Sequence, residues 1–320
     1  MPKWTNTGIR SITVQFLLFD QFSNMCLANC LEPMRAVNTL VGRDFYHWRF
    51  LSLCGDRVVS SSGLPILPHA ALDPGDSCDF LFVVASYDFQ KHDTADCRRR
   101  LRQSAKSCKV MVGLDTGPWL MASAGLLSGR RATLHWETLD SFSERFLNID
   151  TLRHRVVRDE NRITCAGAMS AFDLTRSMIE DHLGSAVALD IDAMLLRDDS
   201  LALQHLGSSQ TATNPVQKAI AAMHSNIEQP LSLSALSKIS ACPPKTLLRR
   251  FKAVLDATPV QVYRHIRLTN ARQLVESSSL SISEIALRSG YESAAALSRA
   301  FKTRFGLSPR ELSKTYRSAR

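Results

Sequence analysis

The first 200 residues alternate short apolar runs with stretches in which apolar residues recur at helical spacing. The apolar runs, which predict strands, are 12–19, 48–53, 80–85 and 110–114. The helical stretches between them are 24–40, 94–107 and 117–127. Runs that are apolar at nearly every position are typical of strands buried on both faces. This alternation predicts an α/β domain with a mostly parallel, flavodoxin-like sheet covered by helices on both sides.

The same pattern continues more weakly and then stops at residue 196. It predicts a helix at 136–146, short strands at 153–157 and 162–165, and helices at 168–183 and 187–196. The segment that follows, up to Pro215, is rich in Ser, Thr and Asn, which is typical of a linker. We therefore expect a first domain over 1–200, a linker over 201–215 and an all-α domain over 216–320.

The second domain contains one pattern twice. The segment Leu-Ser-Leu-Ser-Ala-Leu at 231–236 recurs as Leu-Ser-Ile-Ser-Glu-Ile at 280–285. Five later positions, Leu247, Arg249, Phe251, Lys252 and Pro259, recur as Leu297, Arg299, Phe301, Lys302 and Pro309. Such self-similarity indicates one supersecondary unit used twice. Each copy has the pattern of a short helix, a turn and a second helix with one apolar face. We therefore expect helix-turn-helix units at 231–254 and 280–305.

The second helices of the two units, 244–254 and 293–305, have the chemistry of nucleic-acid readers. Their apolar residues share one face. Their basic residues share the opposite face; these are Lys245, Arg249, Lys252, Arg299, Lys302 and Arg304. A connecting helix over 259–276 joins the two units. A small helical bundle with a solvated basic face would show the same periodicity, but it does not explain why Arg, Phe-Lys and Pro are repeated at matched positions.

Motifs in residues 216–320 resemble the DNA-binding domain of AraC/XylS-type transcription regulators. They are Ile285-Ala286, Gly290-Tyr291, Leu297-Ser298-Arg299-Ala300-Phe301-Lys302, Phe305-Gly306 and Ser308-Pro309. The resemblance implies that these residues face duplex DNA: Lys245, Thr246, Leu248, Arg249, Lys252, Ser293, Ala295, Ser298, Arg299 and Lys302. Arginine would read guanine, while Leu248 and Ala295 would touch thymine methyl groups. The other basic residues would bind phosphate.

The first unit departs from the family pattern at Pro243, where an N-capping Ser is usual. Proline has no side-chain oxygen that could accept hydrogen bonds from the free N–H groups of a helix. We therefore expect the first reading helix to begin a residue late or to bind less firmly. The turn of the second unit contains Gly290, where a positive φ is often needed.

The distribution of charge supports a nucleic-acid partner for the second domain. The chain holds 39 Lys and Arg and 30 Asp and Glu. Residues 211–320 hold 17 of these basic residues but only 6 of the acidic ones, so the positive excess lies there. We expect no signal peptide and no membrane span, because no long apolar run follows a basic N-terminal segment or occurs elsewhere. Eight Cys without C-x-x-C pairs predict free thiols in a cytoplasmic protein that holds no metal or cofactor.

The candidate centre of the first domain is the segment 110–119, in which a strand runs into the sharp turn Asp115-Thr116-Gly117 and a helix begins at once. Ligand sites of parallel sheets lie at such carboxyl ends of strands. The segment resembles the nucleophile elbow of the class I amidotransferase-like, PfpI-type fold, and the resemblance covers roughly residues 10–195. Further matching motifs are Glu32-Pro33-Met34-Arg35-Ala36, residues 122–129, and Ala132-Thr133-x-His135-Trp136.

The elbow departs from the family enzymes because Asp115 stands where they carry Cys. A carboxylate cannot replace a thiolate in forming a labile thioester. His135 matches the position of the catalytic His but has no nucleophile to deprotonate. We therefore expect a binding pocket derived from a catalytic one and no enzyme activity. The alternative is an amidase or peptidase of the PfpI type with an attached DNA-binding domain.

The residues expected around the elbow favour a cation. The candidate ligand-binding residues are Glu32, Asp115, Thr116, Trp119, His135 and Trp136. Asp115 at a helix N-terminus should be ionised, and the family pattern brings Glu32 toward it. Carboxylates with aromatic faces hold quaternary ammonium or guanidinium groups. The structural alternatives are that Asp115 only caps its helix and that each Trp belongs to the core.

Together the two domains resemble regulators that join a PfpI-like sensor to an AraC-type reader. The Asp-Thr-Gly elbow resembles the subgroup that responds to betaine- and carnitine-type compounds. The resemblance implies a homodimeric transcription regulator that binds promoter DNA, usually an activator, with RNA polymerase as a possible partner. We expect a small cationic or zwitterionic effector, with arginine as the competing candidate.

Overall fold

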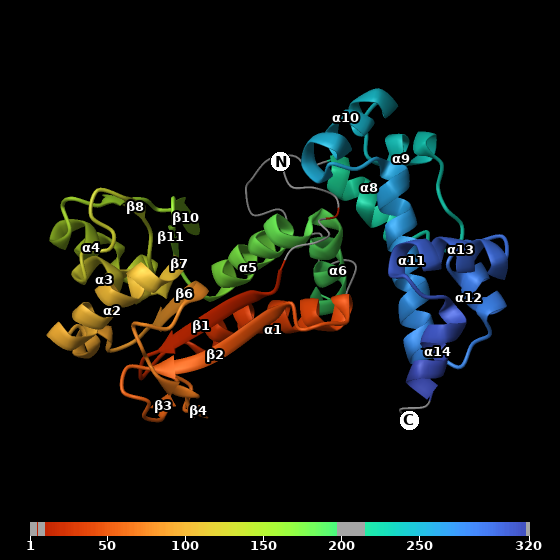
Figure 1. The fold of residues 1–320 in the computed structure, drawn as a ribbon. Coiled ribbons are helices and arrows are strands. Elements are labelled where there is room, and N and C mark those ends of the chain that lie inside the picture. Colours follow the sequence, from red (N-terminus) through yellow and green to blue (C-terminus); the bar gives the residue numbers. More distant parts are fainter. Residues whose placement is uncertain (1–4, 6–9, 197–214, 318–320) are drawn as a thin grey trace. The chain divides into compact units, whose positions relative to one another are not determined.

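The computed structural model describes residue 5 and residues 10–196 and 215–317, which form two compact units (Figure 1). One unit comprises Gly8–His182 and the other begins at Leu183. The expected linker, 201–215, lies outside the described residues except for Pro215, which begins a helix. None of the helices in the described part is long and apolar enough to cross a membrane.

The first unit is built on a seven-stranded sheet with the order β10-β11-β7-β6-β1-β2-β5. In that order the strands are Val156–Asp159, Arg162–Cys165, Cys108–Asp115, Cys78–Ala85, Ile12–Leu18, Tyr46–Ser52 and Ala70–Ala71. Every neighbouring pair is parallel except β10 and β11. The mostly parallel sheet expected from the alternating pattern is therefore confirmed.

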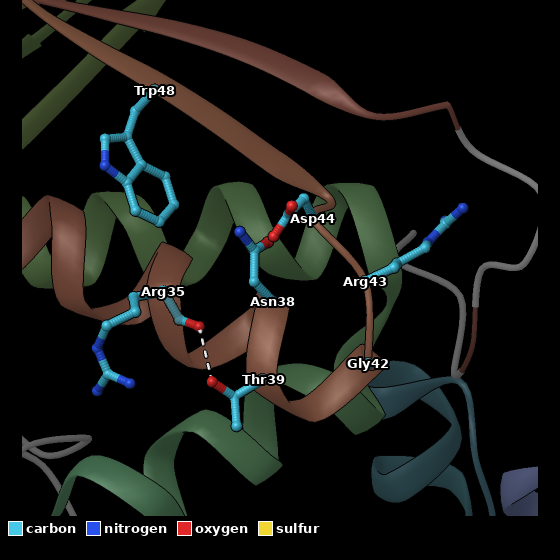
Figure 2. A pocket seen from close by; sticks show the side chains of 7 residues that line it. All are labelled: Arg35, Asn38, Thr39, Gly42, Arg43, Asp44 and Trp48. Atoms are coloured by element: carbon cyan, nitrogen blue, oxygen red, sulfur yellow. Dashed lines mark hydrogen bonds between the residues drawn. The ribbon is translucent and has the colours of Figure 1, made fainter.

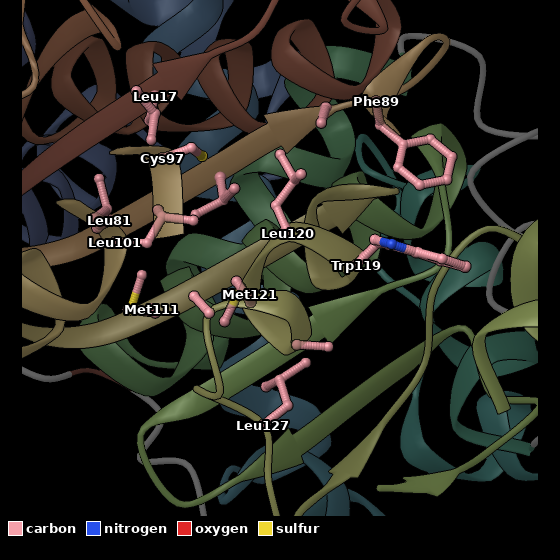
Figure 3. Close-up of a cluster of buried hydrophobic side chains, with 14 of the residues drawn as sticks. Leu17, Leu81, Phe89, Cys97, Leu101, Met111, Trp119, Leu120, Met121 and Leu127 are labelled. Carbon is pink, nitrogen blue, oxygen red and sulfur yellow. The ribbon is translucent and has the colours of Figure 1, made fainter. Parts of the chain in front are cut away.

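Helices flank this sheet, as the sequence predicted (Figure 1). They are α1 (Asn24–Val41), α2 (Ala95–Ser107), α3 (Gly117–Ser123), α4 (Leu139–Arg145) and α5 (Ala168–Leu183), with short 3₁₀ turns at Phe89–His92 and Trp136–Thr138. Apolar side chains of β1, β6 and β7 pack with those of α2 and α3 into one buried cluster (Figure 3). The helix α3 is shorter than the expected 117–127, because Gly125 follows it with a positive φ of 76°.

Two small strand pairs lie outside the main sheet. The strands β3 (Val58–Val59) and β4 (Pro65–Ile66) are antiparallel, and β8 (Arg131–Ala132) pairs with β9 (Asp150–Thr151) in parallel. The sequence did not predict these pairs, since strands of two residues have no periodicity to detect.

The second unit contains eight described helices. They are α6 (Ser185–Leu196), α8 (Pro215–His224), α9 (Leu233–Ile239), α10 (Pro244–Leu255), α11 (Pro259–Ser277), α12 (Ile282–Arg288), α13 (Ala294–Phe305) and α14 (Pro309–Arg317). The helix-turn-helix pairs are α9–α10 and α12–α13, and each has its own apolar cluster. Both clusters include residues of α11. The helix α6, which the sequence analysis included in the first domain, groups with this second compact unit, whose part after the first unit starts at Leu183.

Candidate functional site

The elbow of the first unit has a strained backbone at Asp115, the last residue of β7. Its φ is +59°, a value that is uncommon for residues other than glycine. The backbone is held on both sides, because Thr116 N–H donates to the Ala85 carbonyl at 3.1 Å and His135 N–H donates to the Asp115 carbonyl at 3.0 Å. A Cβ on Gly117 would lie 2.1 Å from the Val83 carbonyl oxygen, so only glycine fits where α3 begins. This geometry is that of a nucleophile elbow.

The carboxyl group of Asp115 is buried and has neutral hydrogen-bond donors. Oδ2 accepts from Ser86 Oγ at 3.0 Å and from Cys26 Sγ at 3.8 Å. Burial raises the pKa of Asp115, although the nearby His135 and the two donors oppose this effect. Our expectation of a readily ionised carboxylate was based on the helix N-terminus alone and neglected the cost of desolvation.

Cys26, and not Glu32, approaches the elbow from α1. The carboxylate of Glu32 is exposed and pairs with Arg35 at 2.7 Å on the outer face of the helix. It lies six residues beyond Cys26, roughly 9 Å further along the helix axis. The expectation that Glu32 faces Asp115 was therefore wrong. Burial and the charge of Asp115 raise the pKa of the Cys26 thiol, so this thiol stays neutral and is no substitute nucleophile.

Trp119 belongs to the core, so its assignment to the ligand site was wrong. The residue is 9% exposed, and its ring packs against that of Phe89 at a centroid distance of 5.1 Å (Figure 3). The rings of Phe142 and Phe146 lie at 5.8 and 5.5 Å. Thr116 Oγ1 donates to the Ser86 carbonyl at 2.8 Å, so that hydroxyl supports the elbow. The spacing of four residues from Asp115 correctly placed Trp119 on the helix that follows the elbow, but it could not show which way the ring points.

Exposed apolar side chains adjoin the elbow residues in the sequence. Trp136 is 70% exposed, and its ring centroid lies 5.8 Å from that of His135. Met25 and Tyr87 are exposed as well. Met25 is next to Cys26 in the sequence and Tyr87 is next to Ser86, and Cys26 and Ser86 are the two donors to Asp115. The sequence analysis missed Met25, Tyr87, Cys26 and Ser86. Tyr87 could have been found as an apolar residue just after β6, and Met25 as one in the first turn of the helix that follows β1.

The structure exposes the expected DNA-facing residues along α10 and α13. Leu247 and Phe251 of α10, and Leu297 and Phe301 of α13, are buried. The exposed residues are Lys245, Leu248, Arg249, Lys252, Ser293, Ala295, Arg299 and Lys302, and Thr246 and Ser298 are partly exposed. Within the described residues, Lys252 pairs with Asp256 at 2.5 Å, whereas the guanidinium groups of Arg249 and Arg299 make no ion pair.

The two reading helices begin differently. Ser293 Oγ accepts from the Ala296 N–H at 3.2 Å, while Pro243 caps α10 without a side-chain hydrogen bond. The missing cap agrees with the sequence analysis, but the expected late start is wrong, since α10 begins at Pro244. Proline at the first helical position needs no partner for an N–H group, so no free donor is left there.

Arg267 of α11 holds the turn between α12 and α13. Its Nε donates to the Ser289 carbonyl at 2.9 Å, its Nη2 donates to the Gly290 carbonyl, and its guanidinium lies 4.3 Å from the centroid of the Tyr291 ring. Gly290 has a φ of +69°, as expected for this turn. The second reading helix therefore starts from a fixed turn.

A shallow surface hollow of about 530 Å³ lies elsewhere on the first unit, at the end of α1 (Figure 2). Its lining residues are Arg35, Asn38, Thr39, Gly42, Arg43, Asp44 and Trp48. None of the expected ligand-binding residues lines it. Among the described residues, no group of three His, Cys, Asp or Glu side chains is arranged to hold a metal ion.

Comparisons with known proteins match both units. Residues 13–181 match the DJ-1/PfpI family, and residues 236–315 match a helix-turn-helix domain. The chain is 33% identical to the HTH-type transcriptional regulator CdhR of Pseudomonas aeruginosa, over 92% of this chain and 89% of that protein. It is 32% identical to the HTH-type transcriptional regulator GlxA of Rhizobium meliloti, over 93% of this chain and 94% of that protein.

A solved structure supports the fold of the first unit. The crystal structure of a ThiJ/PfpI family protein from Pseudomonas syringae aligns with a TM-score of 0.53 at 23% identity, over 75% of this chain and 92% of that one. The relatives that span nine-tenths of the chain are regulators and not enzymes. The chain therefore belongs to the transcriptional regulators that join a DJ-1/PfpI domain to an AraC-type helix-turn-helix domain.

Proposed function

We propose that this regulator activates transcription in response to a small cationic or zwitterionic metabolite bound at the elbow. The observation that carries the proposal is the carboxyl group of Asp115. It is buried, and its hydrogen bonds come from a hydroxyl and a thiol rather than from Lys or Arg. A buried carboxylate without a full cationic partner costs free energy, and a bound cation would remove that cost.

The surroundings of Asp115 favour an ammonium or guanidinium group over a metal ion. Trp136, Tyr87 and Met25 are exposed and follow or precede in the sequence the residues that interact with Asp115, and the aromatic faces of Trp136 and Tyr87 would attract such cations. A betaine- or carnitine-type compound also carries a carboxylate, to which a ring N–H of His135 would donate a hydrogen bond. Arginine is the competing ligand because its guanidinium fits a carboxylate in two hydrogen bonds.

The DNA side of the proposal uses the two reading helices. Arg249 and Arg299 have guanidinium groups free to form bidentate contacts with guanine. Lys245 and Lys302 are exposed beside them and would bind phosphate. Homodimer formation and activation through RNA polymerase complete the proposal; both are usual in the family that the chain resembles.

Calorimetric titration of the full chain with glycine betaine, carnitine and arginine tests the effector site. We expect one of them to bind and the Asp115→Asn variant to lose that binding. Trp136→Ala should weaken the binding, whereas Leu67→Ala, at another strongly exposed apolar residue, should not. No heat with any of the three compounds, or full binding by Asp115→Asn, would refute a cation site at the elbow.

The same titration has a second readout. Because burial raises the pKa of Asp115, a bound cation should lower that pKa and release part of a proton. The measured heat should then depend on the ionisation enthalpy of the buffer, and this dependence should vanish in Asp115→Asn. A heat that is equal in phosphate and Tris buffers would show that the carboxyl group does not change its protonation on binding.

A further inference from the structure

A carboxylate on α6 contacts both halves of the DNA-binding unit. Asp190 Oδ1 lies 2.8 Å from Nε2 of His265 and accepts a hydrogen bond from Thr269 Oγ1 at 2.8 Å. Its Oδ2 lies 4.0 Å from Nη2 of Arg304. His265 and Thr269 are on the connecting helix α11, while Arg304 is in the last turn of the second reading helix, α13. One side chain therefore joins three helices.

The two helix-turn-helix halves share little apolar packing. The cluster of the first half ends on α11 at Ile266, and the cluster of the second half begins at Leu268. The halves also touch at the turn of Gly290, where a Cβ would lie 2.4 Å from the Ile227 carbonyl oxygen. Without further contacts, the angle between the two reading helices would depend on the stiffness of α11 and on this turn.

The helix α6 supplies a further connection. Leu189 of α6 packs against the apolar cluster of the first half, and Asp190 reaches the second half through Arg304. Asp190 is strongly buried, which by itself disfavours its charge, but His265, Arg304 and Thr269 outweigh burial and lower its pKa. The contact is therefore made by a stable carboxylate.

We infer that Asp190 is a positioning residue that fixes the orientation of α13 relative to α10, and so sets the spacing of the two DNA half-sites that the protein accepts. This inference rests on duplex binding by α10 and α13. It assigns Asp190 no contact with DNA. Two reading helices on one DNA face recognise half-sites about one helical turn, or roughly 10 base pairs, apart. A change of orientation alters the preferred spacing without altering the bases read in either half-site.

The test is selection of binding sites from a random duplex library by full-length protein. Wild type should enrich two half-sites at one spacing and discriminate against a change of one base pair by about tenfold. Asp190→Asn should enrich the same bases in each half-site but reduce the discrimination between spacings to about twofold. Asp190→Glu should restore part of it. The control is Glu276→Gln, which breaks an ion pair with Arg272 within α11 and should keep the wild-type spacing.

Arg304→Gln is a second variant in case Asp190→Asn does not fold, and it should relax the spacing in the same way. A sharp wild-type spacing in Asp190→Asn or Arg304→Gln would overturn the inference and leave the proposed function standing. Enrichment of a single half-site by wild type would overturn it as well. Failure of the wild type to enrich any sequence would instead refute sequence-specific binding, and the inference with it.

Discussion

The thiol of Cys26 lies 3.8 Å from Oδ2 of Asp115, and both groups are buried. Burial raises the pKa of both groups, and the charge of Asp115 raises that of the thiol further, whereas the hydrogen bond from Cys26 lowers that of Asp115. The elbow thus combines a thiol that cannot easily ionise with a carboxyl group at the position of a nucleophile. Thioester chemistry has no thiolate to start from at this elbow, whereas an incoming cation would favour the ionised form of the Asp115 carboxyl group.

Asp115→Asn should stabilise the protein at neutral pH. The pKa of Asp115 is raised in the folded protein. The wild-type protein therefore has its full stability below the pKa of the unfolded state and loses stability as the pH rises through the folded-state pKa, a loss that asparagine cannot undergo. Asparagine tolerates the positive φ and keeps a similar shape. We expect a gain of about 1 kcal/mol in the free energy of unfolding at pH 7, shrinking to nothing below pH of about 3.9. Urea unfolding followed by Trp fluorescence measures it, since the described tryptophans, Trp48, Trp119 and Trp136, lie in the first unit.

The control for this prediction is Asp88→Asn. Asp88 also has a positive φ, of 53°, but its side chain is exposed and pairs with Lys91. It should show no gain that grows with pH. A loss of stability in Asp115→Asn at pH 7 would mean that the hydrogen bonds of the carboxylate outweigh its burial.

Gly117→Ala should disrupt the elbow. The added Cβ would lie 2.1 Å from the Val83 carbonyl, and a backbone atom in the centre of the sheet cannot move away as a flexible side chain can. We expect a loss of about 3 kcal/mol or more. Gly129→Ala is the comparison, because its Cβ meets nothing within 4 Å and only its φ of +71° opposes alanine, at about 1–2 kcal/mol. Similar losses for both variants would show that the sheet yields at Val83.

The sequence predicted those parts of the fold that repeat with a clear period. The apolar runs of the parallel strands and the duplicated pattern of the second unit gave strands and reading helices within a few residues, because burial on one face fixes the spacing of apolar positions. The helix α8 and the two small strand pairs were missed. The place of α6 was also missed, because its contacts with His265 and Arg304 come from distant parts of the chain.

The turn at the elbow could be predicted from the sequence, but the residues that pack around Asp115 could not. Asp115, Thr116 and Gly117 are adjacent in sequence, so the turn that they form could be anticipated. Which residue of α1 faces Asp115 depends on how that helix is rotated on the sheet. The motif at 32–36 pointed to Glu32, whereas Cys26, in an earlier turn of the helix, contacts Asp115. The prediction that Trp119 binds the ligand failed for a similar reason, because helical spacing does not show whether a ring points toward a ligand or toward Phe142.

Ser293→Ala should destabilise the second reading helix, whereas Pro243→Ala should have little effect on the first. Ser293 accepts a hydrogen bond from the Ala296 N–H, and loss of such a cap costs about 1 kcal/mol. Pro243 makes no such bond, so its replacement removes no cap. Hydrogen exchange should become faster in α13 of Ser293→Ala and stay nearly unchanged in α10 of Pro243→Ala. Equal effects in the two helices would show that tertiary packing, and not capping, holds their first turns.

Arg299→Ala and Lys302→Ala should weaken DNA binding in different ways. Both side chains are exposed on α13, three residues apart, but we propose that Arg299 reads a base and that Lys302 binds phosphate. Arg299→Ala should cost about 1–3 kcal/mol on the preferred site and relax the choice of one base. Lys302→Ala should weaken binding to all duplexes alike and reduce the salt dependence by about one phosphate contact.

Fluorescence anisotropy with a selected site and with single-base variants of it, at several salt concentrations, separates the two effects. Arg310→Ala serves as the control for general charge loss, since Arg310 is exposed on α14 rather than on a reading helix. Uniform loss across sequences for Arg299→Ala would contradict its role in reading bases. Relaxed base choice in Lys302→Ala would show that Lys302, and not Arg299, reads a base. The helix α13 would then be rotated about its axis in the groove, relative to the orientation that the family pattern implies.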